Sequence, residues 1–216
     1  PQMFREVTDI LLGSVVFGMK HSVPVMKRQG SGVIINTASI AGLGVGYGGS
    51  MYSASKAAVI HLTRVIANEV GESNIRVNAI APGAIPTAIF GRAGGMTQEA
   101  AEALIPMLRA GFATAQPIPR SGDANDVANA ALWLASEASG FVTGICIPVE
   151  GGLTTGKLFS QRVAEMQRIH LRIDDLGLRC HLDLYVRLEA DAAMLAHVQL
   201  VARVQEDAIM AIRTHQ

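Results

Sequence analysis

Residues 33–39 read Val-Ile-Ile-Asn-Thr-Ala-Ser, an apolar, β-branched run that ends in polar residues. Such a run predicts a buried parallel strand over residues 32–38, with Ser39 at its carboxyl end. Open α/β sheets bind their ligands in the crevice outside the carboxyl ends of the strands. We therefore expect Ser39 to hydrogen-bond a substrate oxygen. The alternative is a hydroxyl that only caps backbone groups at the end of the strand.

The next helix is expected over residues 51–71, and its first turns read Tyr-Ser-Ala-Ser-Lys at 52–56. Tyr52 and Lys56 are four residues apart, so they share one face of the helix. A phenol alone is a poor proton shuttle at neutral pH, but a neighbouring ammonium favours its charged form. We interpret Tyr52 as a general acid/base and Lys56 as its cationic neighbour. A core-packed aromatic and a solvated lysine are the alternatives.

Ser39, Tyr52 and Lys56 resemble the Ser–Tyr–Lys catalytic motif of the short-chain dehydrogenase/reductase family in identity and spacing. The resemblance extends over about residues 1–156. Further matches follow in the family's order: Arg76–Gly83 (Arg-Val-Asn-Ala-Ile-Ala-Pro-Gly), Thr87, Asp126–Ala128, Phe141–Gly144 and Glu150–Gly152. The resemblance implies an oxidoreductase that transfers a hydride between a nicotinamide cofactor, NAD or NADP, and a secondary alcohol or ketone.

The resemblance also implies a set of cofactor-binding residues: Tyr52, Lys56, Pro82, Gly83, Ile85 and Thr87. In the family the lysine hydrogen-bonds the nicotinamide ribose, and the Pro-Gly turn meets the carboxamide. Thr87 matches the threonine that contacts the cofactor's phosphate or amide. A plain Pro-Gly turn and a helix N-cap at Thr87 are the alternatives.

One part of the family pattern has no counterpart here. Family members open with a strand, a glycine-rich turn and a helix that bind the adenosine and pyrophosphate. This chain opens on what resembles the helix before the serine strand, so we expect an N-terminally truncated piece that binds the cofactor weakly or not at all. Gly44, Gly46 and Gly49 fit the spacing of a dinucleotide fingerprint. We instead expect a flexible loop on the substrate side, because the strand that follows does not end in an acidic residue.

A further departure lies at Leu11, which aligns with a family asparagine that helps to hold a water of the proton relay. A leucine side chain cannot hydrogen-bond that water. The relay is therefore expected to be weakened or rerouted in this chain.

Composition limits the classes of function. Half of the 216 residues are hydrophobic, 17% are charged and the formal net charge is zero, which fits a buried parallel sheet and makes nucleic acid an unexpected partner. No apolar run approaches the ~20 residues that span a bilayer, so we expect a cytoplasmic protein with no membrane partner. Neither the two cysteines nor the six histidines form a ligand motif, so no metal is expected.

Strands alternating with helices predict an α/β fold: a partial, Rossmann-like, doubly wound parallel sheet that lacks its first strands. The other expected elements are helices at 4–28, 97–110 and 123–136 and strands at 75–80 and 145–149. Residues 84–121, named here the lid segment, resemble the family's mobile lid over the substrate. Their apolar residues favour a hydrophobic substrate, although core packing explains such residues equally well.

Residues 157–216 match no family known to us and form a second expected region, a mainly helical extension after the family domain at 1–156. Alternation over residues 176–188 favours a strand, and a stripe over 189–213 favours an amphipathic helix. A packed appendage, a piece of a fused domain and a tail from an altered reading frame remain open.

Self-association is expected because the strand at 32–38 lacks a neighbour on one edge. In the family, the helices that correspond to 4–28 and 51–71 commonly pack in a dimer, so a homo-oligomer is anticipated. The alternative to an active oxidoreductase is a catalytically silent fragment that acts only through such subunit association.

Overall fold

The computed structural model describes residues 2–175. The chain divides after Leu158 into two units, Pro1–Leu158 and Phe159–Gln216, and each is described by itself. The strand expected over 176–188 and the helix expected over 189–213 lie outside the described residues.

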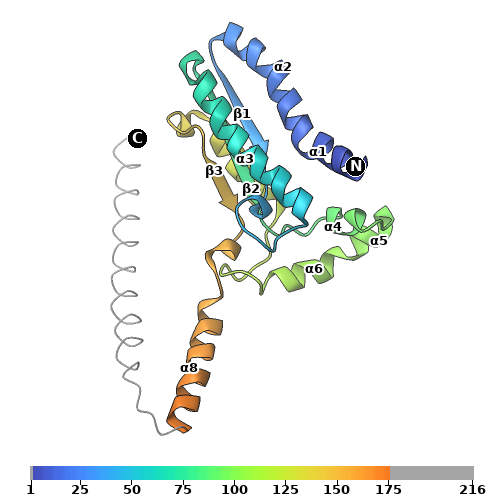
Figure 1. The fold of residues 1–216 in the computed structure, drawn as a ribbon, viewed down its shortest axis with the longest axis vertical. Helices are drawn as coiled ribbons and strands as arrows, with labels where there is room; N and C mark the ends of the chain where they lie inside the picture. The colour runs from blue at the N-terminus through green and yellow to red at the C-terminus, as the bar shows by residue number, and fades with distance from the viewer. Residues whose placement is uncertain (1, 176–216) are drawn as a thin grey trace, which may run out of the picture. The chain divides into compact units, whose positions relative to one another are not determined.

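The first unit is built from helices that flank one small sheet (Figure 1). Its helices are α1 (Gln2–Thr8), η1 (Asp9–Gly13), α2 (Ser14–Gln29), η2 (Ile40–Gly42), α3 (Ser50–Val70), η3 (Gly71–Ser73), α4 (Ile89–Ala93), α5 (Gln98–Ala103), α6 (Ile105–Phe112), α7 (Ala124–Ala135), η4 (Glu137–Ser139) and η5 (Leu153–Thr155). Its strands are β1 (Gly32–Thr37), β2 (Ile75–Pro82) and β3 (Cys146–Val149).

The sheet has the order β1-β2-β3, and both pairs of strands are parallel. Ile34 pairs with Val77, and Ala79 pairs with Cys146. The central strand β2 is buried along most of its length, whereas Val33–Ile35 of β1 are only half-buried. The strand expected at 32–38 is thus observed over Gly32–Thr37 as an edge strand among the described residues, and it is less buried than its apolar run predicted.

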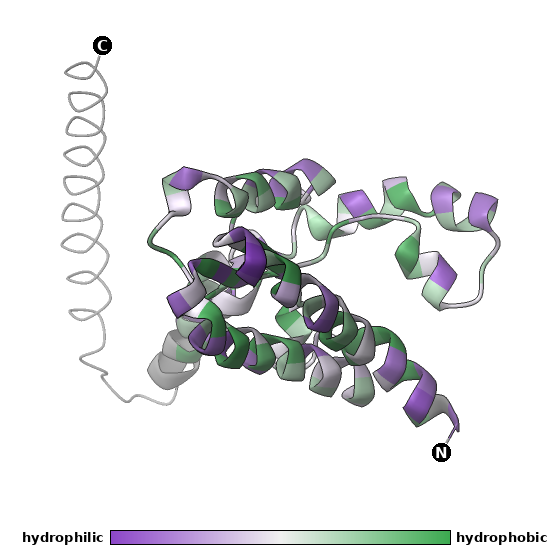
Figure 2. Cartoon of the chain, turned by 90° about the horizontal axis from the view of Figure 1, so that it is seen from above, coloured by the Kyte–Doolittle hydropathy of each residue, from purple (hydrophilic) through white to green (hydrophobic). Residues whose placement is uncertain are grey.

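Helices cover both faces of the sheet, which confirms the α/β expectation. On one face, Ile75 and Val77 of β2 are fully buried and join a core cluster with residues of α2 and α3, among them Met19 and Ala67. On the other face α7 packs against all three strands. Figure 2 shows hydrophobic and hydrophilic residues interspersed along the same helices. Such a mixture is expected of helices that have one side against a core and the other in solvent.

Buried polar side chains fix the strands to their neighbours. Asn36 of β1 donates to Thr63 Oγ1 of α3 over 2.9 Å. On β2, Asn78 donates to the Val142 carbonyl (2.9 Å) and accepts from the Ile145 amide (3.2 Å), which holds the start of β3 in register. Each bond satisfies a group whose burial without a partner would be costly.

Three expected elements differ in detail. The helix expected at 4–28 is observed over residues 2–29, with the π-helical segment η1 inside it. The helix expected at 97–110 is split into α5 and α6, since Leu104 ends one helix and Pro106 stands in the first turn of the next. The strand expected at 75–80 continues to Pro82.

The described part of the second unit is one helix, α8 (Phe159–Asp175). The guanidinium of Arg162 lies over the ring of Phe159, 5.6 Å from its centroid. Phe159 and Ile169 are exposed.

Candidate active site

Ser39 lies two residues after the end of β1 and is the N-cap of the short helix η2. Its Oγ accepts a hydrogen bond from the Ala41 amide over 3.1 Å, and the residue is buried (8% exposed). Ser39 therefore does cap a backbone amide, which is the alternative role that the sequence left open. Because a hydroxyl is both donor and acceptor, this bond leaves the O–H of Ser39 able to donate to a substrate oxygen.

Lys56 links helix α3 to the end of strand β1. Its Nζ donates to the carbonyl of Thr37 over 2.8 Å, two residues before Ser39. Burial lowers the pKa of the Lys56 ammonium from its ordinary value of 10.5. An ammonium has three donors, and one of them is used here by the described residues. Lys56 can therefore hold a ligand oxygen while it stays fixed to the strand.

Tyr52 lies one helical turn before Lys56, as the spacing predicted. The Lys56 ammonium stands 5.8 Å from the centroid of the Tyr52 ring. Tyr52 is 37% exposed, so its phenol is accessible to a ligand. The structure thus brings Tyr52 and Lys56 together at the carboxyl end of β1, where Ser39 also lies.

The Pro82–Ile85 turn leaves the carboxyl end of β2. The amide of Gly83 donates to the Val149 carbonyl over 3.0 Å, and the amide of Ile85 donates to the Gly83 carbonyl over 3.1 Å. A Cβ on Gly83 would lie 2.5 Å from that of Glu150. Gly83 is therefore required for the close approach of this turn to the segment after β3, and any role toward a cofactor falls to the opposite side of its backbone.

Thr87 lies in the turn before α4 and is half-buried. The N-cap of α4 is Ala88, so the sequence alternative of an N-cap at Thr87 is wrong. Within residues 2–175 we find no hydrogen bond of the Thr87 hydroxyl, which leaves this group able to contact a ligand.

A pocket of about 280 Å³ lies at the other end of this edge of the sheet, beside β3. It is lined by Ala84, Ile85, Gln116, Ile118, Arg120, Gly122, Asp126, Pro148, Val149, Glu150 and Gly151. Of the residues that the sequence singled out for the cofactor, it contains Ile85, and none of Ser39, Tyr52 and Lys56 lines it.

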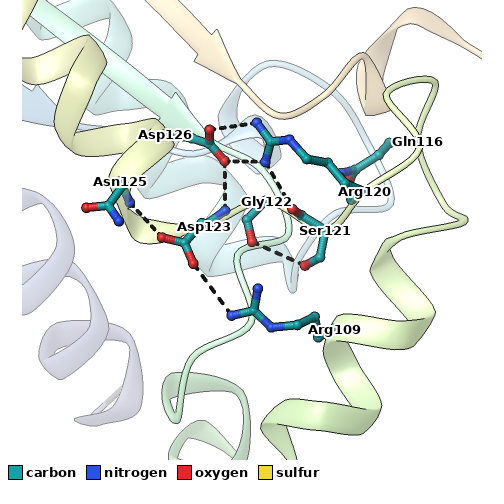
Figure 3. Close-up of polar contacts among 8 residues, drawn as sticks. All are labelled: Arg109, Gln116, Arg120, Ser121, Gly122, Asp123, Asn125 and Asp126. Atoms are coloured by element: carbon teal, nitrogen blue, oxygen red, sulfur yellow. Dashed lines mark hydrogen bonds and ion pairs between the residues drawn. The ribbon is translucent and has the colours of Figure 1, made fainter.

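Arg120 and Asp126, two charged residues that line this pocket, are paired with each other (Figure 3). Arg120 donates to both oxygens of Asp126 over 2.7 Å. The hydrogen bond from Arg120 and one from the Asp123 amide lower the pKa of Asp126 to about 2. Asp123 and Asp126 also form a capping box at the start of α7. The carboxylate of Glu150 accepts from the amides of Gly152 (3.1 Å) and Thr154 (2.7 Å).

Leu11 lies in the π-helical segment η1, which packs against α3. Its side chain offers no hydrogen bond, as the sequence indicated. Thr8, at the start of the same segment, has a buried Oγ1 with no hydrogen-bond partner in the described part of the chain. Neither the π-helical geometry nor this unpaired hydroxyl could be predicted from the sequence.

Neither a cluster of metal-ligating side chains nor a membrane-spanning helix is found in the described residues. No group of three or more His, Cys, Asp or Glu side chains there could hold a metal ion. No helix there is both long enough and apolar enough to cross a membrane.

The comparison with protein families agrees with this geometry. The family model described as enoyl-(acyl carrier protein) reductase matches residues 1–154. The chain belongs to the short-chain dehydrogenase/reductase family.

Two similar curated proteins are dehydrogenases. The chain is 38% identical over 151 residues to the 7α-hydroxysteroid dehydrogenase of Bacteroides fragilis, covering 70% of this chain and 54% of that protein. It is 41% identical over 155 residues to the 2,5-dichloro-2,5-cyclohexadiene-1,4-diol dehydrogenase of Sphingobium indicum, covering 71% and 58%. The chain thus spans a little over half the length of these relatives.

Solved structures share the fold over the same region. Levodione reductase superposes with a TM-score of 0.62 at 34% identity, covering 71% of this chain and 58% of that one. A 7α-hydroxysteroid dehydrogenase in complex with NADH and 7-oxo glycochenodeoxycholic acid superposes with a TM-score of 0.59 at 36% identity, covering 70% and 56%.

Proposed function

We propose that this chain carries the catalytic residues of an oxidoreductase that transfers a hydride between a nicotinamide cofactor and a secondary alcohol or ketone. The observation that carries the proposal is the position of Lys56, which donates to the end of β1 and stands 5.8 Å from the Tyr52 ring. This arrangement presents a phenol, an ammonium and the Ser39 hydroxyl from one edge of the sheet.

Each of the three residues has a distinct proposed role. Tyr52 exchanges a proton with the substrate oxygen, which requires an accessible phenol. Ser39 donates a hydrogen bond to that oxygen, because the bond that it accepts from the Ala41 amide leaves its O–H available. Lys56 provides the neighbouring positive charge. The nicotinamide, when bound, supplies or accepts the hydride.

The cofactor of this proposal is NAD or NADP. The free donors of Lys56, the backbone of the Pro82–Ile85 turn and the hydroxyl of Thr87 would hold its nicotinamide half. These groups fit because two donors of Lys56 and the hydroxyl of Thr87 have no hydrogen-bond partner among the described residues. Support also comes from two similar proteins whose structures are described in complex with NADH.

The proposed substrate is a small, mainly apolar cyclic alcohol or ketone. Ile89, Phe90, Met96 and Met107 of the lid segment are exposed large hydrophobic residues. The rings of Phe90 and Phe112 pack 5.3 Å apart. Similar curated proteins are named for steroid and cyclohexadiene-diol substrates, which supports an apolar ring as the recognised group.

We further propose that the chain forms a homo-oligomer in the cytoplasm, where nicotinamide cofactors are available. Phe4 and Ile10, on α1 and η1, and Phe17, on α2, are more than half exposed, and burial of such residues favours association. Residues 1–156 would form the catalytic region and residues 157–216 an extension. Association without catalysis is the second candidate function, supported by the same exposed residues.

The proposed function is tested by an activity assay on the whole chain. Absorbance of reduced nicotinamide is followed with NADH or NADPH at millimolar concentration and a panel of cyclic ketones, with the reverse reaction on the matching alcohols. Turnover above the uncatalysed rate supports an oxidoreductase. No turnover with any substrate, together with a dimer by light scattering that Phe17→Glu disrupts, would favour association alone.

A further inference from the structure

Contacts of the ring itself set the orientation of the Tyr52 side chain. Its hydroxyl makes no hydrogen bond to any of the described residues, and its ring has the Lys56 ammonium near one side. A reactive phenol requires a defined orientation, because a misplacement of about 1 Å can cost about 100-fold in rate. Some other contact must therefore fix the ring.

Gly48 makes that contact. A Cβ on Gly48 would lie 2.8 Å from Tyr52 Cδ1 and 3.3 Å from the Cβ of Ala41. The first distance is shorter than side-chain atoms tolerate, and Cδ1 belongs to a rigid ring near the helix backbone. The Tyr52 ring thus occupies the space that any side chain at position 48 would fill.

The backbone at Gly48 does not itself require a glycine. Its φ lies outside the left-handed region, unlike that of Gly46. Ser53 of α3 ties this backbone to the helix, since its Oγ donates to the Gly48 carbonyl over 3.3 Å. The glycine is therefore explained by the ring beside it and not by the turn.

Gly42, the last residue of η2 at the start of the loop to α3, has a similar close contact. A Cβ on Gly42 would lie 2.6 Å from the carbonyl carbon of Lys56 and 2.7 Å from the Ala57 nitrogen. Gly42 and Gly48 thus place the loop that follows Ser39 against Lys56 at one end and Tyr52 at the other. Tyr47 ties the loop to η5, because its Oη donates to the Leu153 carbonyl over 3.2 Å.

We propose that Gly48 is a positioning residue for Tyr52: the missing side chain at position 48 sets the orientation of the phenol relative to Lys56 and the substrate oxygen. This inference rests on the proposed function. It makes Gly48 part of the reaction through Tyr52 and not through contact with a substrate or cofactor.

The test compares Gly48→Ala with Gly49→Ala in protein with ¹³C-labelled tyrosine rings. A Cβ on Gly49 would meet no atom within 4 Å, and its φ is −64°, so this variant is a matched control. The Tyr52 resonance is assigned by its loss in Tyr52→Phe. The inference expects Gly48→Ala to shift this resonance and Gly49→Ala to leave it in place.

Kinetics give a second readout. Gly48→Ala is expected to lower kcat by about 10–100-fold with little change in KM, because the substrate contacts remain. Addition of Ala41→Gly, which removes the nearby Cβ, should restore part of the loss. Gly71→Ala, at the far end of α3 with open space around it, serves as the activity control.

An unshifted Tyr52 resonance in Gly48→Ala would overturn the inference, and so would an equal shift in Gly49→Ala. Loss of the folded spectrum in Gly48→Ala would overturn it as well, because Gly48 would then be a requirement for folding. If the unsubstituted chain shows no turnover, the proposed function fails, and the ring resonance alone decides whether Gly48 orients Tyr52.

Discussion

The carboxyl edge of the sheet has two corners with opposite properties. The reactive corner, defined by Ser39, Tyr52 and Lys56, lies at the end of β1 and lines none of the pocket. The pocket corner, defined by Arg120, Asp126 and Glu150, lies beside the end of β3 and holds a cavity of about 280 Å³. None of Ser39, Tyr52 and Lys56 therefore lies in the wall of this cavity.

The difference lies in how the hydrogen-bonding groups are used. At the pocket corner Arg120 and Asp126 form an ion pair, and each carboxylate oxygen of Glu150 accepts from one backbone amide. At the reactive corner the O–H of Ser39 and two donors of Lys56 remain for a ligand. We infer that the pocket corner stabilises the fold and that the reactive corner performs chemistry.

The largest expected effect comes from removal of one oxygen at the reactive corner. Tyr52→Phe should lower turnover by about 1,000-fold, since it deletes the group that exchanges a proton with the substrate. Asp126→Asn, at the pocket corner, should leave turnover unchanged within error. Parental turnover in Tyr52→Phe would remove the distinction between the corners.

A smaller effect is expected for Ser39→Ala, about 100-fold in kcat, because one hydrogen-bond donor to the substrate oxygen is lost. The variant also loses the cap to the Ala41 amide, which is worth about 1 kcal/mol of stability. Thermal unfolding measured beside the kinetics separates the two losses. A fall in stability with an unchanged kcat would show that Ser39 only caps the backbone.

The smallest effect concerns stability at the pocket corner. Asp126→Ala should lower the free energy of unfolding by about 1–2 kcal/mol, as it removes a partly exposed ion pair and a capping-box acceptor. Asp126→Asn should cost less, because an amide oxygen can still accept from the Asp123 amide. Chemical denaturation of the three proteins measures both differences.

The same variants predict a pH dependence. The folded-state pKa of Asp126 is lowered to about 2, whereas the ordinary pKa of an aspartate is ~3.9. The negative charge of Asp126 therefore stabilises the fold fully at pH values above the ordinary pKa. This contribution is lost as the pH falls toward 2. The stability difference between the parent and Asp126→Asn should shrink over that interval. A difference that stays constant down to pH 2 would mean that the charge of Asp126 does not stabilise the fold.

Local pattern was enough to predict the parts of the site that depend on spacing. The β-branched run before Ser39 predicted strand β1. The four-residue interval from Tyr52 to Lys56 predicted that both side chains lie on one face of α3. The π-helical segment around Leu11 and the split of the lid helix before Pro106 were not predicted, because each depends on how neighbouring turns pack.

Other features could not be predicted from the sequence because they depend on contacts between residues far apart in the chain. The half-buried state of β1 depends on which strands lie beside it, and the role of Asn78 depends on a loop more than sixty residues later. Gly48 was overlooked for a related reason. Its neighbours in the glycine-rich loop satisfied a known spacing, whereas its own function follows from a contact with the Tyr52 ring.

The most direct test of the central claim maps where a nicotinamide cofactor binds. The chain, labelled with ¹⁵N, is titrated with NADH to millimolar concentration, and amide shifts are followed by NMR. We predict that the shifts cluster at Thr37–Ser39, Tyr52–Lys56 and Pro82–Thr87. Shifts confined to residues 116–122 and 148–151 would contradict the assignment of the chemistry to the reactive corner.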